Sequence, residues 1–183
     1  MRDLYSRPET PQLEPVSAES ALGQDDAGET GEHTTETQYC IFRCGRERFC
    51  LRVLDVEEVV EWPTVTNVPL APSFLMGIFN LRGGIVPVVD IAFTEGRRPD
   101  LLPRHCVVAS LFSEEGEQYI RLGIATDEVI GTYTTQDPLL VEEAPRDVPH
   151  CNGMLRHGEG SEERLALSLD LKKLFAAFPV PVI

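Results

Sequence analysis

The sequence predicts an all-β protein in which two small β-barrels pack together. Short runs of β-branched and aromatic residues alternate with turn residues, and each half of the folded part holds about five such runs, which is typical of a small closed barrel. The same order of runs and turns recurs in both halves. Because a half of about 65 residues buries too little surface to be stable alone, we expect the two barrels to share an apolar seam.

The clearest pair of strands is a β-hairpin in the first half. Apolar runs at 75–79 and 85–89 flank the segment Asn80-Leu81-Arg82-Gly83-Gly84, and a short loop that contains glycine is typical of a hairpin turn. The strands are too apolar to be solvated on both faces, so at least one face lies in a core. Arg82 is the only charge in this stretch, and it is presented at or beside the tip. It is either a binding determinant or a solvated turn residue.

The repeat is visible as three pairs of equivalent residues with similar surroundings. A Glu follows the second strand of each half, a Gly opens the later hairpin, and an Asp closes it. Constant order with a drifting offset indicates a duplicated unit whose loops differ in length. The pairs are Glu58 and Glu128, Gly77 and Gly153, and Asp90 and Asp170.

One short helix is expected at the C-terminal end. Asp170 can act as its N-cap, and Leu171, Leu174, Phe175 and Phe178 share one face. Two prolines then end it.

Composition bounds the classes of partner. The net charge is −14, which disfavours nucleic acid and anionic membrane because both require a basic surface. No apolar run approaches the roughly 20 residues that span a bilayer, and the N-terminus lacks the apolar centre of a signal peptide, so we expect a cytoplasmic protein without membrane insertion. Residues 1–37 are polar and acidic, which predicts a flexible N-terminal tail.

The sequence offers no recognisable catalytic, metal or cofactor site. The five cysteines form no C-x-x-C pair and no His lies at a zinc spacing. We therefore favour the interpretation that the cysteines are small buried hydrophobic residues. Cys151 follows His150, but neighbours on a strand point to opposite faces and cannot form a dyad. Phosphate-binding glycine loops are also missing from the sequence. We therefore predict that the protein is not an enzyme and that it holds no metal or cofactor.

A longer pattern surrounds the hairpin. V-x-E-V at 56–59 is followed by V-P-x-x-P-x-F-x-x-G-x-x-N-L-R-G-x-x-x-P-V-x-D at 68–90. This order closely resembles the CheW family, the adaptor proteins of bacterial chemotaxis arrays, and the resemblance runs from Tyr39 to about Phe178. It implies a domain at 38–183 made of two five-stranded barrels of the Src-homology-3-like type, at about 38–95 and 104–170, with a C-terminal helix at 170–178.

The resemblance also implies a function and a site. The protein would be a non-catalytic adaptor that couples chemoreceptors (methyl-accepting chemotaxis proteins) to the chemotaxis histidine kinase. Its partners would be the receptor's cytoplasmic tip and the kinase's regulatory domain. Arg82 would pair with Glu58, while Glu57 points away by strand alternation. Val56, Phe79 and Leu81 would border an apolar surface for a receptor helix, unless they are plain core residues. The expected receptor- and kinase-binding residues are Val56, Glu58, Phe79, Asn80, Leu81, Arg82 and Gly83.

Two alternatives remain open from the sequence. Residues 93–103 and 156–164 depart from the family pattern, which leaves room for a CheW-like protein of a gliding or pilus motility system that binds receptor but not kinase. An unrelated β-barrel that binds a small ligand would need a pocket with convergent polar groups, and the sequence supplies no such set.

Overall fold

The computed structural model describes residues 36–91, 103–113, 117–137, 139–140, 148, 150–158, 160 and 163–178. Nearly all of the predicted N-terminal tail, and nearly all of the segment at 93–103 that departs from the family pattern, lie outside the described residues.

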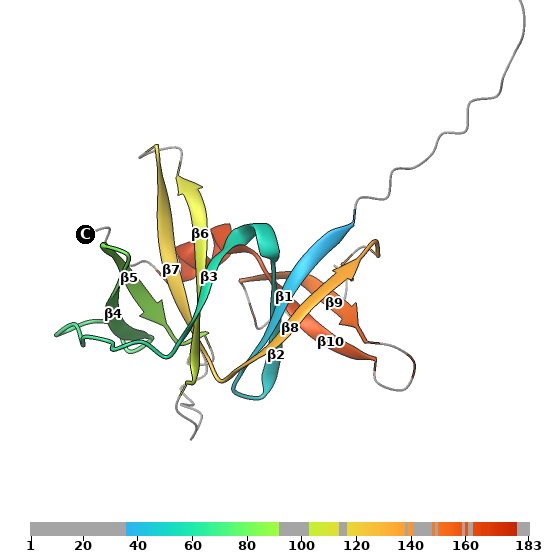
Figure 1. The fold of residues 1–183 in the computed structure, drawn as a ribbon, viewed down its shortest axis with the longest axis horizontal. Helices are drawn as coiled ribbons and strands as arrows, with labels where there is room; N and C mark the ends of the chain where they lie inside the picture. Colours follow the sequence, from blue (N-terminus) through green and yellow to red (C-terminus); the bar gives the residue numbers. More distant parts are fainter. Residues whose placement is uncertain are drawn as a thin grey trace, which may run out of the picture. The chain divides into compact units, whose positions relative to one another are not determined.

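Within the described residues, ten strands form two five-stranded sheets (Figure 1). Sheet A has the order β8-β1-β2-β10-β9, with β1 (Thr37–Cys44), β2 (Glu47–Arg52), β8 (Glu128–Thr135), β9 (Cys151–His157) and β10 (Arg164–Leu169). Sheet B has the order β3-β6-β7-β5-β4, with β3 (Val56–Glu61), β4 (Leu75–Leu81), β5 (Gly84–Val89), β6 (His105–Ser113) and β7 (Gln118–Thr126). The all-β prediction is confirmed, although neither sheet closes into a barrel through its strand ladder.

The predicted division of strands between the two halves is wrong. Each sheet mixes both halves, because β1 and β2 pair with β8 to β10, whereas β6 and β7 pair with β3 to β5. The two sheets have the same order when each strand is replaced by its equivalent in the other unit. The equivalent strands are β1 and β6, β2 and β7, β3 and β8, β4 and β9, and β5 and β10. The duplicated units have therefore exchanged their first hairpins. The exchange is completed by two parallel pairs, β2 with β10 and β5 with β7.

The duplication itself is confirmed by matching hydrogen bonds, but the predicted equivalence of Glu58 with Glu128 is wrong, since the strand register equates Glu58 with Gly131. The Asp90 N–H donates to the Phe74 carbonyl at 2.9 Å, and the Asp170 N–H donates to the His150 carbonyl at 2.9 Å. An isolated bridge also recurs in each unit, with both N–H groups donating to the opposite carbonyls. These bridges join Thr66 to Ile78 and Leu140 to Met154.

The core confirms the predicted apolar seam. Its largest cluster takes residues from both sheets and from the C-terminal helix, including the fully buried Phe42, Leu122 and Leu174. Burying such a side chain contributes about 1.5–3 kcal/mol. Two smaller clusters each belong to one sheet. The seam therefore holds the two sheets together as one folded unit.

The five cysteines are free and buried, as predicted. Burial raises the pKa of the Cys50, Cys106 and Cys151 thiols to about 12. They are protonated at neutral pH and behave as small core residues.

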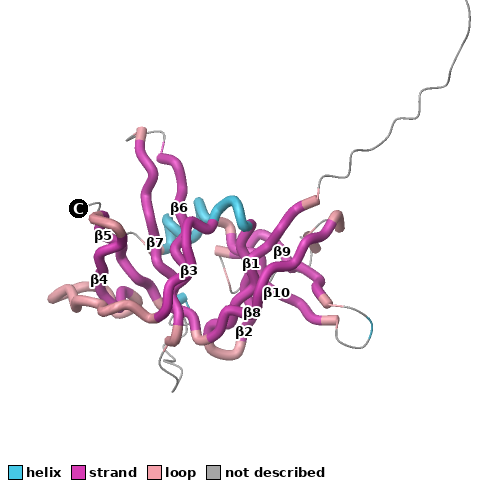
Figure 2. Tube along the Cα trace, in the orientation of Figure 1, coloured by secondary structure: helices cyan, strands magenta, loops and turns pink. Residues whose placement is uncertain are grey.

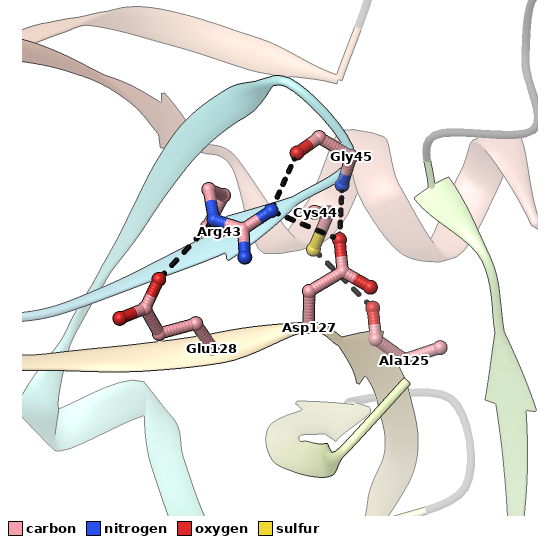
Figure 3. Close-up of polar contacts among 6 residues, drawn as sticks. All are labelled: Arg43, Cys44, Gly45, Ala125, Asp127 and Glu128. Carbon is pink, nitrogen blue, oxygen red and sulfur yellow. Dashed lines mark hydrogen bonds and ion pairs between the residues drawn. The ribbon is translucent and has the colours of Figure 1, made fainter. Parts of the chain in front are cut away.

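Polar contacts connect the end of β1 with the chain that passes from β7 to β8 (Figure 3). One Asp127 carboxylate oxygen accepts the Gly45 N–H at 2.6 Å and lies 3.5 Å from Arg43 Nη1. Arg43 Nη1 also donates to the Gly45 carbonyl at 2.8 Å, and its Nε donates to Glu128 at 3.2 Å. This network fixes the point where the chain leaves sheet B and enters sheet A.

The predicted C-terminal helix is confirmed as α1 (Leu171–Ala177), drawn in cyan in Figure 2. Asp170 is its N-cap, and its carboxylate accepts the Lys173 N–H at 3.1 Å. Leu171 and Leu174 are buried in the seam. Phe178 follows the helix and packs edge-on against Phe74, with ring centroids 5.0 Å apart. The apolar face predicted from the sequence is thus the face that holds the helix in place.

Candidate functional site

The β4–β5 hairpin presents Arg82 on a tight turn. Leu81 and Gly84 form the last strand pair, so Arg82 and Gly83 are the two loop residues. Both have positive φ, 53° and 88°, as a type I′ turn requires. Asn80 Oδ1 accepts the Gly83 N–H at 2.8 Å and braces the turn. The chain thus holds an arginine, rather than the usual glycine or asparagine, in the left-handed region, with 76% of its side chain exposed.

Arg82 forms the predicted pair with Glu58. Arg82 Nη2 lies 3.1 Å from Glu58 Oε1. Glu58 belongs to β3 and Arg82 follows β4, and these strands are the two edges of sheet B. The contact therefore joins two edges that share no ladder. Because the Arg82 side chain is largely exposed, the pair adds about 0–1 kcal/mol to stability. Its main effect is to orient the guanidinium while leaving the rest of that group free.

A second Arg–Glu pair lies beside the first, and sequence reasoning missed it. Arg121 Nε of β7 lies 2.7 Å from Glu57 Oε2. The pairing of β3 with β6 shifts register between Val56 and Glu58, which gives Glu57 its own direction, away from Arg82 as predicted. Arg121 Nη1 also lies 2.7 Å from where a Cβ at Gly84 would be. The sequence signal that could have indicated this close approach is Gly84, because the turn itself requires only one glycine, Gly83.

Phe79 and Leu81 are core residues, which is the second of the two alternatives that the sequence left open for them. They are 6% and 8% exposed and belong to the core of sheet B. Alternation along β4 directs both inward and leaves Asn80 exposed between them. Val56 is half-buried against the seam. These three apolar residues support the hairpin from below, and the exposed part of the predicted set is Asn80, Arg82 and Gly83.

An exposed aromatic pair continues the surface beyond Arg121. Phe112 of β6 and Tyr119 of β7 are strand partners, 49% and 69% exposed, with ring centroids 5.3 Å apart in an edge-to-face arrangement. The next partners on the same face are Ser110 and Arg121. Exposed aromatics beside arginine are the composition of protein-binding hot spots. We call the exposed set Arg82, Phe112, Tyr119 and Arg121 the sheet B surface.

Other site types are not supported by the part of the chain that the structure describes. No three His, Cys, Asp or Glu side chains there gather closely enough to hold a metal ion. No helix there is both long and apolar enough to cross a membrane. A cavity of about 370 Å³ is lined by residues 67–73 and Leu75, and the only polar side chains in that lining are Asn67 and Ser73.

Comparison with known proteins agrees with the pattern of the sequence. Residues 38–178 match the family model described as CheW-like domain. The chain is 29% identical over 140 residues to a probable chemotaxis protein CheW from Rhizobium etli, covering 74% of this chain and 84% of that protein. It is 24% identical over 156 residues to a chemotaxis protein CheW from Treponema pallidum, covering 76% and 82%. The crystal structure of the scaffolding protein TtCheW from Thermoanaerobacter tengcongensis has the same fold, with a TM-score of 0.62, 22% identity, and coverage of 79% of this chain and 90% of that one.

Proposed function

Because this chain belongs to the CheW-like domain family, we propose that it is the adaptor that couples chemoreceptors to a chemotaxis histidine kinase. The protein acts in the cytoplasm by binding its two partners in stoichiometric amounts and positioning them, without catalysing a reaction. The sequence relatives are themselves chemotaxis proteins, which supports a place in the same kind of system.

The observation that carries this proposal is the presentation of Arg82. Its guanidinium is held by Glu58 on one side, its side chain is 76% exposed, and it stands on a turn that is braced by Asn80. A fixed arginine loses less side-chain entropy on binding than a mobile one. Its remaining N–H groups can donate to a carboxylate or to backbone carbonyls of a partner. Such a group suits recognition of a surface rather than chemistry on a substrate.

The kinase's regulatory domain and the receptor's cytoplasmic tip are the proposed partners. By family resemblance the regulatory domain has the same double-barrel fold, and the receptor tip is helical. Arg82 supplies the polar contact of the sheet B surface, and Phe112 and Tyr119 supply apolar area around it. Aromatic anchors surrounded by polar groups give affinity, and a fixed charge gives orientation.

The test uses the two partners separately and then together. We expect the full chain to bind a receptor cytoplasmic fragment and a kinase regulatory domain in separate titrations. We also expect receptor control of kinase autophosphorylation only when the chain is added in stoichiometric amounts. Binding to the receptor fragment alone would favour the motility alternative, and binding to neither partner would overturn the proposal.

A further inference from the structure

Sheet A carries a group of basic side chains at one end of its own core. That core consists of Tyr39, Ile41, Cys50, Leu155 and Ala166. Four basic residues each lie two positions along the same strand from one of these core members, and therefore on the same face as that member. They are Arg43 on β1, Arg48 on β2, His157 on β9 and Arg164 on β10.

The strand register places these residues in two neighbouring rows, because the pairing of Cys50 with Ser168 sets Arg48 two residues from the level of Arg164. Arg43 is the strand partner of Arg48, and Arg164 is the strand partner of His157. The parallel pairing of β2 with β10 joins the two pairs. Burial and the positive charges of Arg48 and Arg164 together lower the pKa of His157. Arg48, His157 and Arg164 thus lie near one another, in a chain whose net charge is −14.

Only one of the three arginines has its charge balanced within the described residues. Arg43 pairs with Asp127 and Glu128, whereas Arg48 and Arg164 form no ion pair in this part of the chain. Arg48 Nε and His157 Nε2 are buried from solvent and have no hydrogen-bond partner there. His157 is only 8% exposed. Buried polar atoms are normally satisfied, because each one left unpaired costs about 1–3 kcal/mol.

The duplicated unit shows what is missing. In the parallel pairs, Ser168 is the partner of Cys50 and Val88 is the partner of Gly123. The repeat equates Val88 with Ser168, so Arg48 of sheet A corresponds to Arg121 of sheet B. Arg121 is satisfied by a carboxylate of the chain itself, at 2.7 Å from Glu57. The strand register sets Ile130 at the position that Glu57 has in sheet B, so the described part of sheet A supplies no carboxylate there, and a partner's carboxylate fits that position.

We propose that Arg48, His157 and Arg164 form a binding site for an oxyanion, the carboxylate of an acidic segment on a partner protein. The guanidinium groups donate to the two carboxylate oxygens, and His157 Nε2 donates to one of them when it carries a proton. The site lies on sheet A and uses none of the residues of the sheet B surface. It is therefore independent of the proposed adaptor function.

The test follows the His157 imidazole by NMR in the full chain at constant ionic strength. The His157→Gln variant assigns the signal among the four histidines. A hexaglutamate peptide is titrated in one arm and inorganic phosphate in the other. We expect hexaglutamate to shift the His157 signals saturably and to raise the pKa of His157 by about one unit, because a nearby negative charge favours the imidazolium. Phosphate should bind at least tenfold more weakly.

The variants separate a built site from general charge effects. Arg48→Gln and Arg164→Gln should each weaken the peptide response at least tenfold, whereas Arg156→Gln should not, since Arg156 pairs with Glu163 at 3.1 Å instead. Arg164 is exposed, so its variant keeps the test decisive if Arg48→Gln fails to fold. An unresponsive His157, tighter binding of phosphate, or a peptide response in Arg164→Gln as strong as in Arg156→Gln would overturn the proposal. So would a response that appears only after Glu159 and Glu162 are replaced by glutamine, since the chain would then fill its own site.

Discussion

Glu58 and Arg82 stand at opposite edges of sheet B in ladder order, yet their side chains meet at 3.1 Å. The contact is possible because the hairpin tip after β4 reaches the first edge strand, and the bridge between Thr66 and Ile78 draws the chain that follows β3 toward β4. A side-chain pair and an isolated bridge thus do what a closed ladder would do in a barrel. This arrangement leaves the Arg82 guanidinium both oriented and exposed.

The exchanged hairpins predict that neither half of the sequence folds alone. A fragment of residues 36–91 would keep β3 to β5 but lose β6 and β7, which lie between them in sheet B. We expect this fragment and the fragment 103–178 to lack cooperative thermal unfolding separately, and to regain it when they are mixed. Circular dichroism melting checks this. A cooperative transition in either fragment alone would contradict the exchange.

Two glycines should respond differently to a methyl group. In Gly84→Ala the Cβ comes too close only to the flexible end of Arg121, while the Leu81 carbonyl oxygen is at an ordinary 3.5 Å, so we expect a stability loss below about 1 kcal/mol as the Arg121–Glu57 pair rearranges. In Gly77→Ala the Cβ meets the Thr66 backbone at a φ of +139°, and we expect a loss of about 2 kcal/mol or more. Chemical denaturation of both variants measures the difference. Equal losses would show that the space beside Gly84 is not set by Arg121.

The buried His150 should make the free energy of unfolding decrease on mild acidification. It is 1% exposed, and neither ring nitrogen has a hydrogen-bond partner within the described residues. Burial lowers its pKa in the folded state, so below the unfolded value of about 6.5 the unfolded chain binds the extra proton. Stability is then full above that pH and decreases as the pH falls through it.

The measurement is the free energy of unfolding at pH 7.5 and pH 6. His150→Leu should reduce the difference between the two values, because a leucine does not titrate. His157 also has a lowered pKa, so a smaller dependence should remain. A dependence in His150→Leu as large as in the parent would assign the effect to other groups.

The exposed aromatic pair should contribute to partner binding and little to stability. Phe112→Ala with Tyr119→Ala should weaken kinase or receptor binding at least tenfold, as truncating hot-spot aromatics does. The melting temperature should change little, since both rings are largely exposed. Ile130→Ala on β8, a residue 43% exposed on sheet A, is the matched control. Unchanged affinity in the aromatic variant would remove the pair from the sheet B surface.

Local features of this fold followed from the sequence because they depend on neighbouring residues. The hairpin with Arg82 at or beside its tip, the N-cap Asp170 and the pair of Arg82 with Glu58 were all predicted and are all present, although the loop is two residues long and not the predicted five. Turn chemistry and capping act within a few positions. The pair came from the family pattern, in which both positions are fixed.

The strand exchange could not be predicted in the same way. Alternation shows which face of a strand is apolar, but both units of a duplication offer the same partner faces, so it does not show which copy pairs with which. Whether Phe79 and Leu81 border a surface or lie in the core stayed open, because alternation alone does not distinguish a core from an apolar groove. Arg121 was missed because its contact joins residues 64 positions apart in the chain.

Affinity measured for Arg82→Ala beside Arg156→Ala tests the central claim most directly. Both arginines form exposed pairs with a glutamate at 3.1 Å, Arg82 on sheet B and Arg156 on sheet A. Titration against the receptor fragment and the kinase regulatory domain should show at least tenfold weaker binding to one or both partners for Arg82→Ala alone. The free energy of unfolding of both variants should stay within about 1 kcal/mol of the parent. Equal affinities in the two variants, or a loss of Arg82→Ala binding explained by unfolding, would contradict the account.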